Sequence, residues 1–295
     1  MKGRVLPHLI FLTLTAAIFL PGRAEVHSRW VFAVVMALIE GVFLLRRKKR
    51  ATCGIATIVF TFFLIWELYS SKFSTEGNFL FPPPENVFAI FLEDDSVILN
   101  SVGSSFGMMA LSFAIALALG IPLGLLSGRH NRLRGIVQPI AQVLSPIPGL
   151  IYAPYAVALM PSFWAASVFI LSSGLFWPVL LGVIDTLGQM QKKLTDSAKA
   201  LNLSERSTVF NVLLPYCVPS IFTTLSLQIS NSFLLLVGAE MLGATSGVGW
   251  YVKYSSDFSD YTRVIAGFIV IGVLVSVVNS GLARLRKAAI RWQPS

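Results

Sequence analysis

The stretch that decides the fold is VGSSFGMMALSFAIALALGIPLGLL, residues Val102–Leu126, which carries no charged side chain. A helix that crosses the hydrocarbon core of a bilayer needs about 20 mostly apolar residues. Backbone N–H and C=O groups cannot stay unpaired in that core, so a helix is the structure expected there. The segment is therefore predicted to span a membrane.

Further segments of the same kind occur along the chain, and together they predict an all-α polytopic membrane protein with about eight spans. Of the 295 residues, 55% are hydrophobic and only 13% are charged. A soluble globule of this size cannot bury so much apolar surface. Disordered, disulfide-rich secreted and soluble nucleic-acid-binding proteins are excluded by the same composition. The other predicted spans are Val5–Leu20, Trp30–Leu45, Thr52–Tyr69, Ile136–Leu159, Phe163–Val183, Pro219–Met241 and Val264–Leu282.

The positions of the basic residues predict the orientation. With a cytoplasmic N-terminus, eight spans place 18 of the 23 Lys and Arg residues on the inner side, among them the run Arg46–Arg50. Inner loops of membrane proteins carry an excess of Lys and Arg. We therefore expect a multi-pass protein of the cell inner (plasma) membrane with both termini in the cytoplasm. Residues 1–24 also fit a cleavable signal peptide, whose removal would leave seven spans in the same orientation.

A long outer segment, Ser70–Asn100, separates the third and fourth predicted spans. Pro82–Pro84 end any helix before them, and Glu85 suits the start of a new one. Apolar residues follow at Val87–Leu92. This pattern predicts a short helix lying along the outer interface.

The sequence contains no motif for catalysis or metal binding. It has no G-x-x-x-x-G-K-[ST] phosphate loop, no H-E-x-x-H and no G-x-S-x-G. The histidines His8, His27 and His130 lie in separate regions, and Cys53 and Cys217 are far apart. The chain is therefore expected not to be an enzyme and to hold no metal or cofactor of its own.

Ionisable residues within spans are candidates for function. Glu240 ends a span just before the outer loop Thr245–Tyr251. Two interpretations of Glu240 stay open: a buried acid bonded to that loop, or a residue beside a permeation path. No chain of acids crosses the membrane, which disfavours a proton-coupled carrier. The other acids near spans are Glu40, interpreted as reaching toward the basic run that follows it, Glu67 and Asp185.

The longest predicted inner loop, Lys192–Pro215, is too polar to span. Asp196 suits the start of a helix, and Leu201, Val209 and Leu213 recur at near-helical spacing. The loop is either an amphipathic helix resting on the membrane or a short helix presented to a soluble partner.

This loop resembles that of the permease subunits of binding-protein-dependent ABC importers, which has the form E-A-A-x-x-x-G, nine residues, then I-x-L-P. The chain has Asp196-Ser197-Ala198 at the first three positions, Asn202 in place of Gly, and Val212-Leu213-Leu214-Pro215 at the end. Asn suits the Gly position because it tolerates the left-handed conformation that a tight turn needs.

The resemblance extends over roughly residues 79–292 and is to the nitrate, taurine and aliphatic-sulfonate branch of these permeases. The segments that carry it are Leu80–Pro84, Gly120–Gly124, Ser145–Pro148, Phe176–Pro178, Ala239–Leu242 and Ser246–Trp250.

The resemblance implies a type I ABC importer permease fold, with a six-span core in residues 51–295 and an N-terminal transmembrane hairpin in residues 1–50 outside the resemblance. It implies a homodimer of permeases, separate ATPase subunits that bind ATP and Mg, and an external solute-binding protein. The loop at 190–215 would carry the coupling helix that contacts the ATPase. The residues implied in this coupling are Asp196, Ser197, Ala198, Lys199, Leu201, Asn202, Leu203, Ser204, Glu205, Leu214 and Pro215.

The translocation pathway is predicted from helix breakers and neutral polar groups. Pro146 and Pro148 have no N–H donor and must break the fifth span, and a broken helix exposes backbone groups that can line a polar cavity. An interhelical hydrogen bond is the alternative role of each polar group. Such a pathway suits a small anion or zwitterion such as nitrate, a sulfonate or taurine. The predicted pathway residues are Ser145, Pro146, Pro148, Gln228, Asn231 and Glu240.

Two hypotheses from other classes stay open beside the importer. The first is a stand-alone secondary carrier driven by an ion gradient, with a fortuitous inner loop. The second is a non-transporting membrane scaffold that uses the N-terminal hairpin and the inner loop for docking. Co-purification of an ATPase would favour the importer over the secondary carrier, and solute-dependent ATPase activity of the complex would favour it over the scaffold.

Overall fold

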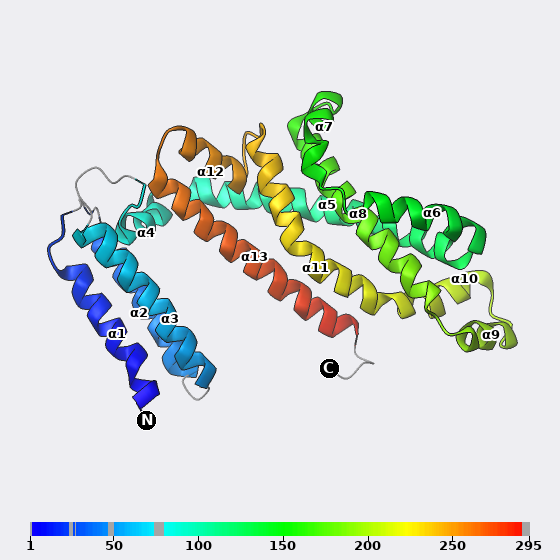
Figure 1. The fold of residues 1–295 in the computed structure, drawn as a ribbon, viewed down its shortest axis with the longest axis horizontal. Helices are drawn as coiled ribbons and strands as arrows, with labels where there is room; N and C mark the ends of the chain where they lie inside the picture. The colour runs from blue at the N-terminus through cyan, green and yellow to red at the C-terminus, as the bar shows by residue number, and fades with distance from the viewer. Residues whose placement is uncertain (1, 24–25, 27, 47–49, 74–79, 291–295) are drawn as a thin grey trace. The chain divides into compact units, whose positions relative to one another are not determined.

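The computed structural model describes residues 2–23, 26, 28–46, 50–73 and 80–290, and their side chains except those at 2–4, 46, 50, 192, 195 and 199. Every regular element in these ranges is a helix (Figure 1), which confirms the all-α prediction. Several helices are long and apolar enough to cross a membrane, and a shorter apolar helix, Val5–Phe19, occurs beside them. The count of eight spans stays a prediction. In the described residues these longer helices are Ala51–Phe73, Asp95–Arg129, Phe163–Gly188, Glu205–Met241 and Tyr261–Ala289.

The chain divides into two compact units, residues 1–99 with 251–269 and residues 100–250 with 270–295. In the first unit, three helices lie side by side and a fourth packs on two of them (Figure 1). Their shared core is rich in phenylalanine, and the rings of Phe32 and Phe88 stack with centroids 5.2 Å apart. The N-terminal helices thus bury apolar surface against the helix that follows them. These elements are α1 (Lys2–Phe19), α2 (Arg29–Arg46), α3 (Arg50–Glu67) with its π-helical extension η1 (Leu68–Phe73), and α4 (Pro84–Glu93).

One buried acid of this unit has a partner that differs from the one expected. Glu40 of α2 pairs with the imidazole of His8 on α1. Its carboxylate therefore turns to the neighbouring helix instead of along α2 toward the basic run. The acid helps to join the two N-terminal helices.

The short helix expected after the proline run is confirmed as α4, which begins at Pro84, while its place on the outer side of the membrane stays a prediction. Val87 and Ile90 are buried, so this helix packs on α2 and α3 instead of only lying at an interface. Its C-cap residue Asp94 accepts hydrogen bonds from Arg263 Nε at 2.6 Å and from the Tyr251 hydroxyl at 2.9 Å. The Arg263 guanidinium lowers the pKa of Asp94 below its usual range.

In the second unit α8 is the central helix and packs on α6, α7 and α11 (Figure 1). The helix α5 approaches α8 closely through Gly120, Gly124 and Gly128, whose spacing of four places them on one helix face. A Cβ at Gly124 would lie 2.8 Å from Val183 Cβ, so only glycine permits this contact. Small residues at such spacing let membrane helices pack backbone to backbone. The bounds are α5 (Asp95–Arg129), α6 (Asn131–Leu144), η2 (Gly149–Ile151), α7 (Ala153–Leu159), α8 (Phe163–Gly188), α9 (Lys192–Ala200), α10 (Glu205–Thr208), η3 (Val209–Leu213), α11 (Leu214–Met241), α12 (Val248–Asp257) and α13 (Tyr261–Ala289).

Candidate coupling segment and translocation pathway

The inner loop folds as two short helices, α9 and α10, joined by a tight turn (Figure 1). Asn202 has a positive φ of 46°, and the Leu203 N–H donates to the Ala198 carbonyl at 3.2 Å. This is a Schellman turn, in which a residue in the left-handed region ends a helix and one of its last carbonyls is satisfied. The expectation that Asn202 takes the place of glycine in a left-handed turn is confirmed.

The turn leads directly into a capped helix. The Ser204 hydroxyl accepts a hydrogen bond from the Ser207 N–H at 3.2 Å and caps α10. From Glu205 the helix continues through the π-helical turn η3 into α11, as one apolar segment that ends at Met241. Pro215 follows η3 inside this continuous helical segment, where its missing N–H removes one backbone hydrogen bond. The inner loop and the span that follows it are therefore mechanically continuous.

The three apolar residues predicted to form a stripe on this loop do not share one face. Leu213 is buried and Val209 packs against the same core cluster of the second unit. Leu201, in the turn between the two helices, is 72% exposed. The stripe expected from the spacing is therefore wrong as a single surface: two members anchor the loop, and one is presented outward.

The remaining coupling residues follow the same division. Ala198 and Leu214 face the body of the unit, Ala198 at 5% exposure. The side chain of Lys199 lies outside those that the structure describes. The other predicted coupling residues are on the exposed side: Asp196, Ser197, Leu203, Ser204 and Glu205.

Polar contacts that sequence reasoning did not identify brace this loop. Arg129 Nη2, at the end of α5, lies 2.9 Å from Glu205 Oε1. Gln138 of α6 donates to Asp185 of α8 at 2.8 Å and accepts from Arg134 Nε at 3.1 Å. The basic residues indicated only the membrane side in the sequence, and nothing in the spacing paired them with Glu205 or Asp185.

The fifth predicted span is broken where two prolines were expected to break it. The helix α6 ends at Leu144 and α7 begins at Ala153, with the short η2 between them. Pro148 has an extended conformation, with φ −63° and ψ 129°. Pro146 and Pro148 are exposed, and Ser145 is half-buried at the end of α6. The break is thus confirmed as a structural feature, while its place in a pathway stays a prediction.

The two polar residues predicted on the seventh span contact each other. Asn231 Nδ2 donates to Gln228 Oε1 at 3.2 Å, within one turn of α11. Within the described residues, no hydrogen bond joins this pair to Ser145 or Glu240. Among the predicted pathway residues on the described part of α11, the structure therefore joins Gln228 and Asn231 by a hydrogen bond, and the break that follows Ser145 packs against the same helix through η2.

Glu240 is 1% exposed and is held at the C-terminal end of α11. Its Oε1 accepts from the Ser105 hydroxyl at 2.5 Å, and its Oε2 accepts from the Gly249 N–H at 2.6 Å. The Val248 N–H in turn donates to Ser105 Oγ at 2.9 Å. A carboxylate at a helix N-terminus satisfies free N–H groups and interacts favourably with the helix dipole.

The loop before α12 contains a glycine, Gly247, that lets the Glu240 carboxyl group approach the backbone. Gly247 has φ +118°, a conformation that favours glycine, and a Cβ there would overlap the Glu240 carboxyl group. This geometry gives a physical reason for the Ser246–Trp250 segment after Glu240. Of the two interpretations of Glu240, the contacts describe the buried acid bonded to its loop.

Among the described residues, no group of three or more His, Cys, Asp and Glu side chains is placed to hold a metal ion. What the second unit combines is a braced, partly exposed inner turn, a continuous helix leading from it, and a broken helix beside that helix.

Comparison with known proteins identifies the class. Residues 120–291 match the family described as the binding-protein-dependent transport system inner membrane component. The match covers more than half of the chain, so the chain belongs to this family. It is a membrane-embedded, multi-pass transport permease subunit of the inner membrane and not an enzyme.

Individual relatives narrow the class to a branch. The taurine transport system permease protein TauC of Escherichia coli (strain K12) is 25% identical, over 83% of this chain and 91% of its own. The putative aliphatic sulfonates transport permease protein SsuC of Bacillus subtilis (strain 168) is 26% identical, over 78% and 84%. The nitrate import permease protein NrtB of Synechocystis sp. (strain ATCC 27184 / PCC 6803 / Kazusa) is 29% identical, over 83% and 94%. The chain is an ABC importer permease of this nitrate, taurine and sulfonate branch.

A solved structure supports the fold. A chain of the inward-facing MetNI methionine ABC transporter aligns with a TM-score of 0.57 at 18% identity, covering 65% of this chain and 96% of that one. This similarity shows the permease fold alone.

Proposed function

We propose that the chain forms the translocation pathway of an ATP-driven importer as one of two identical permease copies. Separate ATPase subunits bind ATP and Mg and dock on the inner loop, and an external binding protein delivers the solute. The chain itself holds no cofactor. The binding-protein-dependent family supports this assembly over a stand-alone carrier or a scaffold.

The observation that carries the coupling proposal is the exposed leucine on a braced turn. Leu201 is 72% exposed, although the turn that holds it is fixed by the Leu203–Ala198 hydrogen bond and by the Arg129–Glu205 ion pair. Exposed leucine side chains on a turn of defined geometry, with Leu203 also exposed beside Leu201, suit an apolar groove of a soluble partner. We assign Asp196–Glu205 to that contact.

The continuity of the inner helix supplies the coupling. When two ATPase subunits close around ATP, their grooves move, and the segment seated in each groove moves with them. Because α10, η3 and α11 form one helical segment, this movement tilts α11 in the membrane. Tilting of packed helices in both copies exchanges inward-open and outward-open states.

The solute is proposed to be a small anion or zwitterion. The relatives whose names state a solute include permeases for taurine, for aliphatic sulfonates and for nitrate. The Gln228–Asn231 pair and the break after Ser145 offer neutral hydrogen-bonding groups that could contact such a solute without holding it tightly.

The topology proposed from the sequence completes this assignment. Both termini lie in the cytoplasm, and residues 1–50 form a transmembrane hairpin that precedes a six-span core in residues 51–295. In support, α1 and α2 are apolar helices that pack with α3 in one bundle.

The test of coupling is Leu201→Asp, with Leu92→Asp as its matched control. Leu201 and Leu92 are 72% and 70% exposed, and the proposed topology places them on opposite sides of the membrane. We expect Leu201→Asp to reduce ATPase capture in a gentle-detergent pulldown and ATP-driven uptake at least tenfold, with normal membrane insertion. Leu92→Asp should leave ATPase capture unchanged. Normal capture and uptake by Leu201→Asp would overturn the proposal.

A second pair of variants tests the turn itself. Asn202→Gly keeps the left-handed conformation and should retain capture, whereas Asn202→Val should lose it, because a β-branched residue at a φ of 46° is strained. Equal capture by the two variants would show that the turn geometry does not matter for docking.

A further inference from the structure

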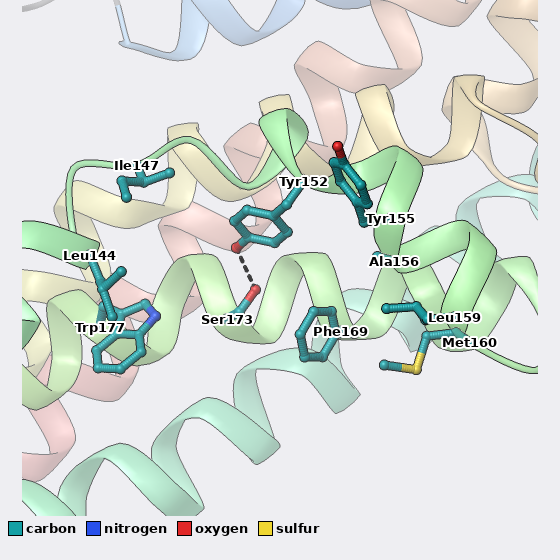
Figure 2. Close-up of a pocket in the computed structure, with 10 residues that line it drawn as sticks. All are labelled: Leu144, Ile147, Tyr152, Tyr155, Ala156, Leu159, Met160, Phe169, Ser173 and Trp177. Atoms are coloured by element: carbon teal, nitrogen blue, oxygen red, sulfur yellow. Dashed lines mark hydrogen bonds between the residues drawn. The ribbon is translucent and has the colours of Figure 1, made fainter.

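A pocket of about 350 Å³ lies in the second unit beside the helix break. Its walls come from one continuous part of the chain: the end of α6, the break, α7 and α8 (Figure 2). The break turns the chain away from α6, so that Tyr152 and Tyr155 come to lie opposite α8. The pocket therefore exists because the fifth span is interrupted.

The pocket is lined largely by aromatic side chains. Tyr152, Tyr155, Phe169 and Trp177 contribute rings, and none of the lining residues is charged. Phe169, Ser173 and Trp177 are spaced by four along α8 and share one helix face, as Figure 2 shows. The wall is thus formed by aromatic rings and aliphatic side chains, and the surface that it presents to the pocket is almost wholly apolar.

A part-buried hydrogen bond fixes the position of one ring. The Tyr152 hydroxyl lies 2.6 Å from Ser173 Oγ (Figure 2). The same tyrosine ring meets Phe169 edge to face, with centroids 6.4 Å apart and an angle of 69° between the planes. Two rings of the wall are therefore held at a defined angle before any ligand enters.

We propose that this pocket binds an uncharged aromatic ring of the transported solute, an inference that rests on the import function proposed above. It restricts that function to organic anions or zwitterions that carry such a ring, with the charged group outside the pocket.

The lining excludes a bare inorganic anion as the occupant. Such an ion would lose its hydration without a cationic partner, and the faces of aromatic rings are electronegative. A planar ring instead meets the fixed rings face to edge, which is the arrangement that aromatic pairs prefer. An aliphatic chain would fill the space but would not use the fixed angle between the Tyr152 and Phe169 rings.

The experiment compares probes that differ in the ring alone. Binding of benzenesulfonate, cyclohexanesulfonate and nitrate to the purified permease–ATPase complex is measured by isothermal titration. We expect benzenesulfonate to bind at least tenfold more tightly than either of the others. Trp177→Leu should weaken benzenesulfonate binding at least tenfold, and Trp177→Phe should restore most of it.

A matched variant and the complex itself separate the outcomes. Trp164→Leu changes a tryptophan of the same helix that does not line the pocket, and it should bind benzenesulfonate like the wild type. Equal affinity for benzenesulfonate and cyclohexanesulfonate would overturn the inference, because it would show a general apolar groove that suits a lipid chain. Binding that is independent of Trp177 would overturn it as well. If no ATPase co-purifies with the wild type, the proposed function fails instead of the pocket.

Discussion

Two buried acidic sites of this protein differ in the hydrogen-bond donors that surround their carboxyl groups. Glu240, in the second unit, receives a hydroxyl and a backbone N–H at 2.5 and 2.6 Å. Glu85 and Glu67, in the first unit, are both completely buried, and their carboxyl oxygens have no hydrogen-bond donor among the described residues. The first acid is supplied with donors, whereas the second pair is short of them.

The nearest cationic side chain does not provide all the hydrogen-bond donors that the two carboxyl groups lack. Lys72 Nζ lies 3.3 Å from Glu67 Oε1 and donates to the Leu20 carbonyl at 2.8 Å. Burial and the neighbouring Glu67 carboxyl raise the pKa of Glu85 well above its usual range. Glu85 therefore keeps its proton in the folded protein where a solvated glutamate would have lost it.

The difference separates two uses of a buried carboxyl group. Fixed donors make Glu240 a structural clamp at the start of α12, whose contribution should depend on its partners. The raised pKa of Glu85, which lies beside Glu67 without hydrogen-bond donors, makes the first unit sensitive to pH. The following changes test this distinction.

The largest effect is expected from Glu240→Ala. It removes two hydrogen bonds to a carboxylate and leaves the Gly249 N–H buried without an acceptor, at a cost of about 3 kcal/mol in unfolding free energy. Thermal or denaturant unfolding of the detergent-purified protein measures it. Asp257→Ala, at an exposed pair with Lys253, is the control and should change stability by less than about 0.5 kcal/mol. Similar losses of unfolding free energy in Glu240→Ala and Asp257→Ala would show that Glu240 is not a structural clamp.

Glu85→Gln should change the pH dependence of stability. The unfolded side chain releases its proton above a pH of about 4, but the folded one retains it. Stability should therefore fall as pH rises from about 5 toward the raised pKa of Glu85, by up to about 1.4 kcal/mol per pH unit. The Gln variant should lose this slope, whereas Glu93→Gln, at an exposed position of the same helix, should keep it. If the stability of the wild type and of Glu85→Gln depended on pH in the same way, Glu85 would not retain its proton in the folded protein.

Ser105→Ala should destabilise the protein by about 1–2 kcal/mol, because Glu240 loses one donor and the Val248 N–H loses its acceptor. Hydrogen exchange at the Val248 amide should accelerate together with the loss of stability. Ser104→Ala, which removes a more exposed bond to Ser246, serves as the control. Unchanged exchange at Val248 would show that Ser105 does not hold the N-terminus of α12.

Asp94→Asn gives the smallest effect and the opposite pH sign to Glu85. Arg263 lowers the pKa of Asp94, so the pair contributes stability above a pH of about 4 and loses it as pH falls through the lowered value. We expect a loss of about 0.5–1 kcal/mol at pH 7, because the pair is partly exposed. The difference should vanish near pH 2, and its persistence there would contradict an ionic origin.

Features that depend on a few neighbouring residues were predictable from the sequence. Pro146 and Pro148 break a helix because they lack an N–H, and Asn202 turns left-handed because its side chain tolerates that conformation. The start of α4 after the proline run follows for the same reason. These features are set by covalent geometry, which the local sequence contains.

Contacts between distant segments were not predictable in the same way. Ser105 and Glu240 are 135 positions apart, and no local pattern joins them. The spacing of Leu201, Val209 and Leu213 indicated a helix, but it did not show that the last two face the core of their own unit and the first faces outward. Periodicity identifies an apolar face, and only packing decides what covers it.

The segment Glu205–Met241 has a mechanical consequence. Its 37 residues would extend about 55 Å at the rise of an α-helix. One end carries the exposed inner turn, and the other carries Glu240, which holds the N-terminus of α12. If this segment moved as one rod, a rotation of about 10° about one end would sweep the other end through about 10 Å. Under the coupling proposed above, a small movement of the exposed turn would therefore be amplified along the helix and would reach the loop that Glu240 holds.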